Sequence, residues 1–150
     1  YGDHRDLHLS IRRQRQMCIR DRNGAFILKM IEEKYVTACH DISDGGLLIA
    51  ITEMAFSSLK KGKKLGVKIT STANLDPFAF YFGEEQSRYI ITTVHPEKLL
   101  KMAQKSGIAA NIIGKTTSNG QLLLPDNCSV PLEELYVKND NWLPEYMLGA

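Results

Sequence analysis

The residues best suited to chemistry form a polar turn, His40–Gly46, with the sequence His-Asp-Ile-Ser-Asp-Gly-Gly. Gly45 and Gly46 would let a ligand approach the backbone closely, and the free N–H groups of a following helix would suit an anion. Asp41 and Asp44 would repel a bare phosphate, but their oxygens could act through bound Mg²⁺. The turn is therefore a candidate site for a phosphate-bearing ligand.

A structural interpretation of the same turn stays open. Ser43 or Asp44 could cap the following helix, a contribution of about 1 kcal/mol, and acidic residues at that end favour the helix dipole. His40 could be a packed, hydrogen-bonded side chain. On the bare residues, capping and packing are favoured over ligand binding.

A second candidate lies in Phe82–Tyr89, where Glu84, Glu85, Gln86 and Arg88 gather before an apolar run. The planar guanidinium of arginine suits carboxylates and phosphates. The alternative is a solvated turn with a local Glu–Arg pair that adds little stability.

Two further groups favour structural roles. The Lys-rich stretch Lys60–Lys64 is typical of a solvated loop rather than a phosphate site. Trp142 and Tyr146 are expected to anchor the C-terminal tail to a core.

The elements that must position these residues follow from hydrophobic spacing and turn residues. Strands and helices alternate and several strands look hairpin-linked, which predicts an α/β sandwich, a mixed sheet with helices packed on one face. We expect helices at 24–34, 47–56, 77–82, 95–105 and 131–135, strands at 35–39, 66–70, 89–94, 110–113 and 121–124, and an amphipathic tail at 140–147. Asn74–Pro77 predicts a helix start, and Ser118–Gly120 a hairpin turn joining the last two strands.

The first 22 residues are interpreted as a translated sequencing adapter. Arg12–Arg22 back-translates in one frame to a transposase-type adapter, and Tyr1–His8 to the flow-cell adapter that precedes it. An in-frame stop codon before Tyr1 would explain a start without Met. Residues 1–22 are therefore expected to be disordered or non-native, with one domain at 23–150.

Charge and composition exclude several classes of protein. The whole chain has 19 basic and 17 acidic residues. Residues 23–150 hold 13 basic and 14 acidic residues, which gives no electrostatic reason to expect a nucleic-acid partner. No apolar run approaches the roughly 20 residues that span a bilayer. Cys39 and Cys128 have no metal-binding spacing, which favours a reducing compartment.

Three motifs together carry a family resemblance: Val36–Leu47, Phe82–Tyr89 and Asn141–Met147. They resemble the synthetase subunit of phosphoribosylformylglycinamidine synthase in its bacterial multi-subunit form. The match is to the C-terminal domain, of the aminoimidazole ribonucleotide synthetase-like superfamily, and covers residues 23–150. It begins where the adapter ends.

The resemblance implies an activity larger than this chain. Such enzymes amidate formylglycinamide ribonucleotide in purine biosynthesis, using ATP, Mg²⁺ and glutamine-derived ammonia. It implies cytoplasmic localisation and, as partners, the earlier domains of the same subunit, a glutaminase subunit and a small bridging subunit. Nucleotide and metal ligands lie mainly in those earlier domains, so the fragment alone is expected to be inactive.

Site residues carry over only as pseudo-equivalents, because the domain copy resembled here is associated with a degenerate nucleotide site. They are Asp41, Ser43, Asp44, Gly45, Gly46, Glu84, Gln86 and Arg88. No catalytic residue and no metal ligand can be assigned. Alternatives are a thiamine-monophosphate kinase, a selenophosphate synthetase, a hydrogenase maturation factor, or a non-catalytic scaffold domain. The Phe82–Tyr89 and Trp142–Met147 motifs argue against the other enzymes.

Overall fold

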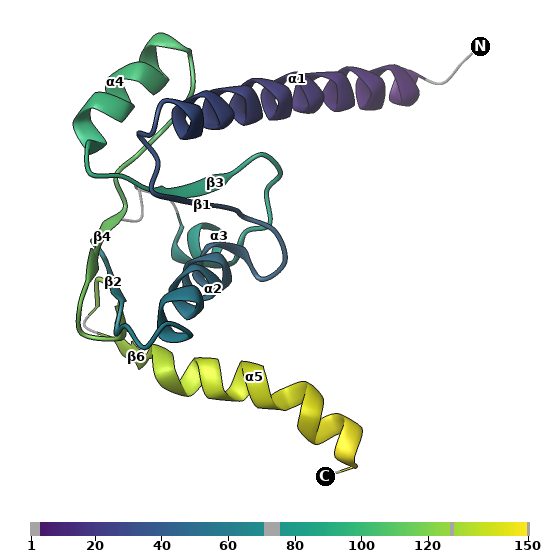
Figure 1. The fold of residues 1–150 in the computed structure, drawn as a ribbon. Helices are drawn as coiled ribbons and strands as arrows, with labels where there is room; N and C mark the ends of the chain where they lie inside the picture. Colours follow the sequence, from purple (N-terminus) through teal and green to yellow (C-terminus); the bar gives the residue numbers. More distant parts are fainter. Residues whose placement is uncertain (1–3, 71–75, 127, 150) are drawn as a thin grey trace. The chain divides into compact units, whose positions relative to one another are not determined.

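The chain forms five helices and six strands in the part that the computed structural model describes, residues 4–70, 76–126 and 128–149 (Figure 1). Side chains are described from residue 17 on. The fold divides into two compact units. The first unit comprises the chain up to Ser43 together with Glu84–Ala110, and the second comprises Asp44–Gly83 together with Asn111–Ala150.

The first unit is built on an antiparallel strand pair. β1 (Ala38–Asp41) pairs with β3 (Tyr89–Thr92), so that Asp41 lies opposite Tyr89. Helices α1 (His4–Glu32) and α4 (Pro96–Lys105) belong to the same unit. They bury Met30 from α1 and Leu99 and Ala103 from α4.

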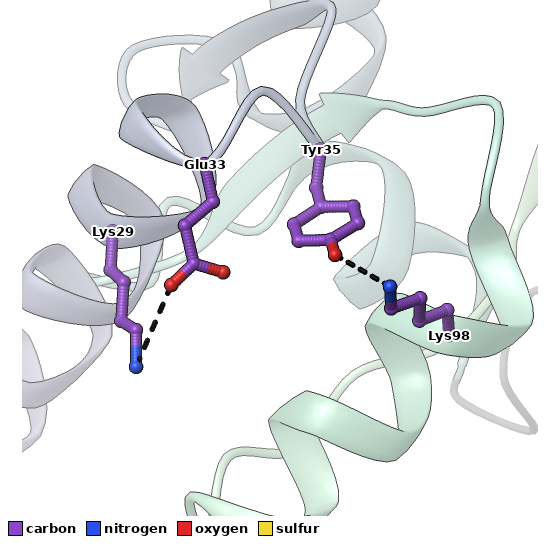
Figure 2. A network of polar contacts seen from close by, with 4 residues as sticks. All are labelled: Lys29, Glu33, Tyr35 and Lys98. Atoms are coloured by element: carbon purple, nitrogen blue, oxygen red, sulfur yellow. Dashed lines mark hydrogen bonds and ion pairs between the residues drawn. The ribbon is translucent and has the colours of Figure 1, made fainter.

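A tyrosine after α1 ties the two helices together. The Lys98 ammonium of α4 donates a 2.5 Å hydrogen bond to the Tyr35 hydroxyl and lies 4.6 Å from its ring centroid. Lys29 and Glu33 form an i,i+4 ion pair of 3.8 Å beside it (Figure 2). The end of α1 is thus fixed against α4 before the chain enters β1.

The second unit holds a four-stranded mixed sheet in the order β4-β2-β5-β6. β2 (Gly66–Ile69) runs antiparallel to β4 (Gly114–Thr117) and parallel to β5 (Gln121–Leu123), which pairs antiparallel with β6 (Ser129–Pro131). Helix α2 (Gly46–Leu59) lies against β2 and contacts α3 (Pro77–Phe82) and α5 (Leu132–Leu148). The core consists of Leu47, Ala50, Ile51, Ala55, Phe56, Ile69, Phe80, Leu122 and Leu132.

The predicted fold class, a mixed α/β arrangement with helices on a mixed sheet, is confirmed, but several boundaries were wrong. α1 begins at His4 and not at Gly24, because residues 12–22 consist mostly of residues that helices accept. β1 begins at Ala38, because Lys34 has φ +61° and the Tyr35 N–H donates to Met30 O at 2.9 Å, which ends α1. The expected domain boundary at residue 23 lies inside α1 and stays a prediction.

The strand expected at 110–113 and its hairpin were also wrong. The strand is β4, at Gly114–Thr117, and β2 lies between β4 and β5. The turn itself exists, with Gly120 at φ +70° and Asn119 Oδ1 accepting from Gln121 N–H. A Cβ at Gly66 would lie 2.3 Å from Asn119 Oδ1, so only glycine lets β2 enter beneath the turn.

The helix expected at 131–135 and the tail at 140–147 form one helix, α5, because no glycine separates them; Pro144 lies within it. The expectation that Trp142 anchors to a core was wrong, since its side chain is 63% exposed and stacks on Tyr146 at 5.7 Å. For the start of α3, Asp76 caps the helix by accepting from Ala79 N–H; Asn74 and Leu75 lie outside the described residues. No helix in the described ranges is long and apolar enough to cross a membrane.

Candidate functional site

The first unit brings two of the predicted motifs together at one end of the β1–β3 pair. The Ile42 N–H, just past β1, donates a 2.9 Å hydrogen bond to the carbonyl oxygen of Arg88, just before β3. Ile42 is buried, while Asp41 and Ser43 on either side are exposed. The segment Asp41–Ser43 and the turn Glu84–Arg88 therefore lie side by side, and the exposed polar groups of the two segments are called the polar surface below.

Arg88 is the central charged group of this surface. Its side chain is only 22% exposed, and its Nη1 lies 3.6 Å from Glu85 Oε2. Glu84, Glu85 and Gln86 are exposed. A half-buried guanidinium with carboxylates and an amide around it can bind a ligand that offers both an anion and hydrogen-bond donors.

The turn before Arg88 has a strained backbone that the sequence did not reveal. Ser87 has φ +70°, a conformation rare for a residue with a Cβ. Its carbonyl oxygen accepts a 3.0 Å hydrogen bond from Asn23 Nδ2 of α1. Sequence reasoning missed Asn23, and the only signal was an asparagine followed by a glycine inside a helix, where both residues are unfavourable.

The β1 strand carries two groups whose chemistry depends on Asp41. His40 Nδ1 lies 2.6 Å from the Asp41 carbonyl oxygen and donates to it, so His40 is a locally hydrogen-bonded, half-buried side chain. Burial, and secondarily the Asp41 carboxylate, raise the pKa of the Cys39 thiol above its ordinary value. Cys39 is therefore held in its neutral form and is a poor nucleophile.

Gly45 and Gly46 belong to the second unit and have an architectural reason to be glycine. Both have positive φ, +79° and +74°. A Cβ at Gly46 would lie 2.7 Å from the Phe82 backbone, where α3 ends, and a Cβ at Gly45 would lie 2.5 Å from Ile49 Cγ1. The close approach of α2 to α3 requires Gly46, whereas Gly45 is favoured by its positive φ and by the Ile49 side chain of α2 itself.

The predicted capping of α2 by Ser43 or Asp44 was wrong. The N-cap is Gly45, and no side-chain hydrogen bond caps the helix. Asp44 is exposed, at the boundary of the second unit. Asp41, Ser43, Glu84, Gln86 and Arg88 lie in the first unit, whereas Asp44, Gly45 and Gly46 lie in the second.

Metal-binding chemistry has no ready site in the described part of the chain. Among those residues, no group of three or more His, Cys, Asp or Glu side chains is placed to hold an ion. A shallow depression on α5 is lined by Glu133, Glu134, Val137 and Lys138, none of which is a predicted site residue.

The family model of the AIR synthase related protein, C-terminal domain, matches residues 17–124. The chain belongs to this family. The match begins inside the segment interpreted as adapter.

Curated relatives make the comparison more specific. The chain is 38% identical over 132 residues to phosphoribosylformylglycinamidine synthase subunit PurL of Methylocella silvestris, covering 86% of this chain and 17% of the relative. It is 34% identical over 132 residues to the PurL subunit of Caulobacter vibrioides, covering 87% of this chain and 17% of the relative. The resemblance to this synthase is thereby confirmed, and the chain spans about a sixth of the length of the relatives it matches.

Solved structures agree on the fold. Thermotoga maritima PurL complexed with ATP superposes with a TM-score of 0.63 at 21% identity, covering 77% of this chain and 21% of that one. A PurLQS structure from the same organism gives 0.64 at 21% identity, covering 78% and 21%. PurL complexed with FGAR gives 0.62 at 20% identity, covering 78% and 21%.

Proposed function

We propose that this chain is the C-terminal segment of a phosphoribosylformylglycinamidine synthase synthetase subunit. The observation that carries the proposal is the 38% identity with a PurL subunit over 86% of the chain. The complete protein would amidate formylglycinamide ribonucleotide with ammonia at the expense of ATP. The γ-phosphate of ATP would be transferred to the formyl-amide oxygen, which releases ADP. Ammonia would then displace that oxygen as inorganic phosphate.

The segment's own contribution is the polar surface formed by Asp41–Ser43 and Glu84–Arg88. The Arg88 guanidinium can hold a phosphate or carboxylate, and the exposed Glu84 and Gln86 can accept or donate hydrogen bonds to sugar or amide groups. We assign no nucleophile among these groups. We assign this surface to binding and shape, with Asp44, Gly45 and Gly46 setting the start of α2.

Mg²⁺ does not fit the described residues as a complete site, since no three candidate ligands come together among them. ATP and Mg²⁺ would be held chiefly by the earlier domains of the subunit, and no step of the reaction runs through this segment's own carboxylates. The partners of the complete protein would be a glutaminase subunit and a small bridging subunit, in the cytoplasm. The near-neutral charge of residues 23–150 gives no support to a nucleic-acid partner.

A chimera tests the proposal. Residues 23–150 replace the matching segment of the Methylocella silvestris PurL subunit, in a bacterial strain that lacks its own synthetase subunit. Growth without added purine is expected, while a matched chimera with the segment deleted should not grow. A soluble, stable chimera that fails to support growth and shows no ammonia-dependent ADP formation with formylglycinamide ribonucleotide would contradict the proposal.

The binding surface is tested in the same chimera with Arg88→Ala. A group that binds the ribonucleotide uniformly should raise its KM with little change in kcat. Arg88→Lys keeps the charge and loses the planar fork, so an intermediate KM is expected. An unchanged KM in the folded variant would remove Arg88 from the binding surface.

A further inference from the structure

We infer that Asn23 is a positioning residue, whose side-chain amide holds the strained Ser87 turn in the conformation that joins Glu84–Arg88 to Ile42. Its side-chain amide nitrogen donates to the backbone carbonyl oxygen of Ser87, at 3.0 Å. Nothing in the family resemblance assigns it a role.

The first observation is the strain at Ser87. Its φ of +70° is a left-handed conformation that disfavours residues with a Cβ, and no glycine stands between Glu84 and Arg88 to adopt it instead. A strained backbone persists only where its surroundings hold it. The turn therefore needs an external contact.

The second observation is that two successive carbonyl groups of the turn are tied to different segments. Ser87 O accepts from Asn23 Nδ2 at 3.0 Å, a contact across 64 residues of sequence. The next carbonyl, Arg88 O, accepts from the Ile42 N–H at 2.9 Å. The turn is thus held between α1 on one side and the end of β1 on the other.

The third observation is the local sequence of α1. A Cβ at Gly24 would lie 3.7 Å from the Tyr89 hydroxyl, so the helix passes beside the tip of the Tyr89 side chain, next to the position where Asn23 makes its contact. Asparagine and glycine both weaken a helix interior. Helix stability does not account for Asn23, whereas its contact with Ser87 does. At Gly24 a Cβ would make only an ordinary contact, so the space there would also accept alanine.

The consequence for the site rests on the proposed function. A loosened turn would let Glu84, Gln86 and Arg88 move relative to Asp41–Ser43, which would weaken ligand binding without removing a contacting group. The structural part of the inference needs no ligand, so its test is separate from the growth of the chimera.

Hydrogen exchange in the ligand-free chain tests it. Asn23→Ala removes the donor but raises helix propensity, so any loss of protection cannot come from a weaker α1. The Ile42 amide should exchange roughly five- to tenfold faster, as expected for the loss of one hydrogen bond. Amides of Leu99–Ala103 in α4 should be unchanged, and Asn139→Ala, at an exposed asparagine of α5, should affect neither region.

A second substitution makes the strain itself the readout. Glycine adopts a positive φ without cost. In a Ser87→Gly background, Asn23→Ala should therefore accelerate exchange at Ile42 by less than about half of the factor seen in the parent chain. Equal effects in both backgrounds would overturn the inference. Equal loss of protection at Ile42 and in α4 would also overturn it, because Asn23 would then support the whole unit rather than the turn.

Discussion

The Ile42 N–H donates to the Arg88 carbonyl oxygen at 2.9 Å, although 46 positions separate the two residues in the numbering. This hydrogen bond extends the β1–β3 pairing by one step beyond Asp41 and Tyr89. It places two polar segments, each ambiguous by itself, side by side. Some of the residues around these segments are required for backbone packing rather than for binding.

Gly46 and Gly62 provide a matched pair of positions that tests this packing. Both have positive φ, +74° and +69°. A Cβ at Gly46 would lie 2.7 Å from the Phe82 backbone, whereas a Cβ at Gly62 would have no neighbouring atom of the described residues within 4 Å. Gly62→Ala should cost about 1 kcal/mol from backbone strain alone. Gly46→Ala should cost about 3 kcal/mol, because α2 and α3 must also separate. Urea unfolding measures both, and equal costs would contradict the close packing.

The raised pKa of Cys39 predicts a slow, pH-dependent thiol. Iodoacetamide should label Cys39 more slowly at pH 8 than the exposed Cys18 and Cys128. Asp41→Asn removes the smaller of the two causes, so the Cys39 rate should rise about two- to threefold while the other two stay constant. No change at Cys39 would show that the Asp41 carboxylate does not act on the thiol.

The same shift fixes the sign of a stability effect. The folded chain holds the Cys39 proton more tightly than the unfolded chain does. The contribution of Cys39 to the free energy of unfolding is therefore complete below the pKa that Cys39 has in the unfolded chain. It is lost as the pH rises through the higher folded pKa. Cys39→Ser should flatten the fall of stability in alkaline solution.

Two lysines face each other across the sheet of the second unit. Lys68 of β2 lies directly opposite Lys115 of β4, and both are exposed. Like charges in this position repel. Lys68→Glu should therefore stabilise the chain by about 0.5 kcal/mol at low salt, whereas Lys61→Glu in the neighbouring turn should change stability less. The gain should shrink in high salt and vanish in the Lys68→Glu, Lys115→Glu double variant.

The chain alone should self-associate and should not hydrolyse ATP. Phe78, Val94, Trp142, Tyr146 and Met147 all expose more than 60% of their surface, and exposed large apolar side chains favour association when they lie together. Trp142→Ser with Tyr146→Ser should lower the associated fraction in analytical ultracentrifugation, because both rings leave the same stacked surface. A monodisperse parent chain with ATPase activity would contradict both expectations.

Local sequence predicted the elements whose residues act locally. Pro96 and Gly107 predicted the start and the end of α4, and Asp76 and Pro77 predicted the start of α3. These predictions succeed because helix caps and proline constraints involve residues that are neighbours in sequence. The order of the strands could not be obtained in this way. Ser118–Gly120 forms the expected turn, yet the partner of β4 is β2, a choice made by packing across the sheet.

The candidate site shows the same division. Asp41, Glu84 and Arg88 were selected by residue type and family resemblance, and the first unit places their segments together. Asn23 could not be found, because a single asparagine in a helix carries no sign of a contact 64 residues away. The role of Gly46 became clear only from the backbone of Phe82.

The placement of Gly66 beneath the β4–β5 connection has a consequence for the time course of folding. Residues 114–123 contain everything that a short hairpin needs, and hairpins of that kind close within microseconds. In the finished sheet, β2 occupies the gap between those two segments. We expect refolding to pass through an intermediate in which β4 and β5 pair directly as a hairpin. This hairpin must open before β2 can insert between them, so a bulkier residue at position 66 should slow that step.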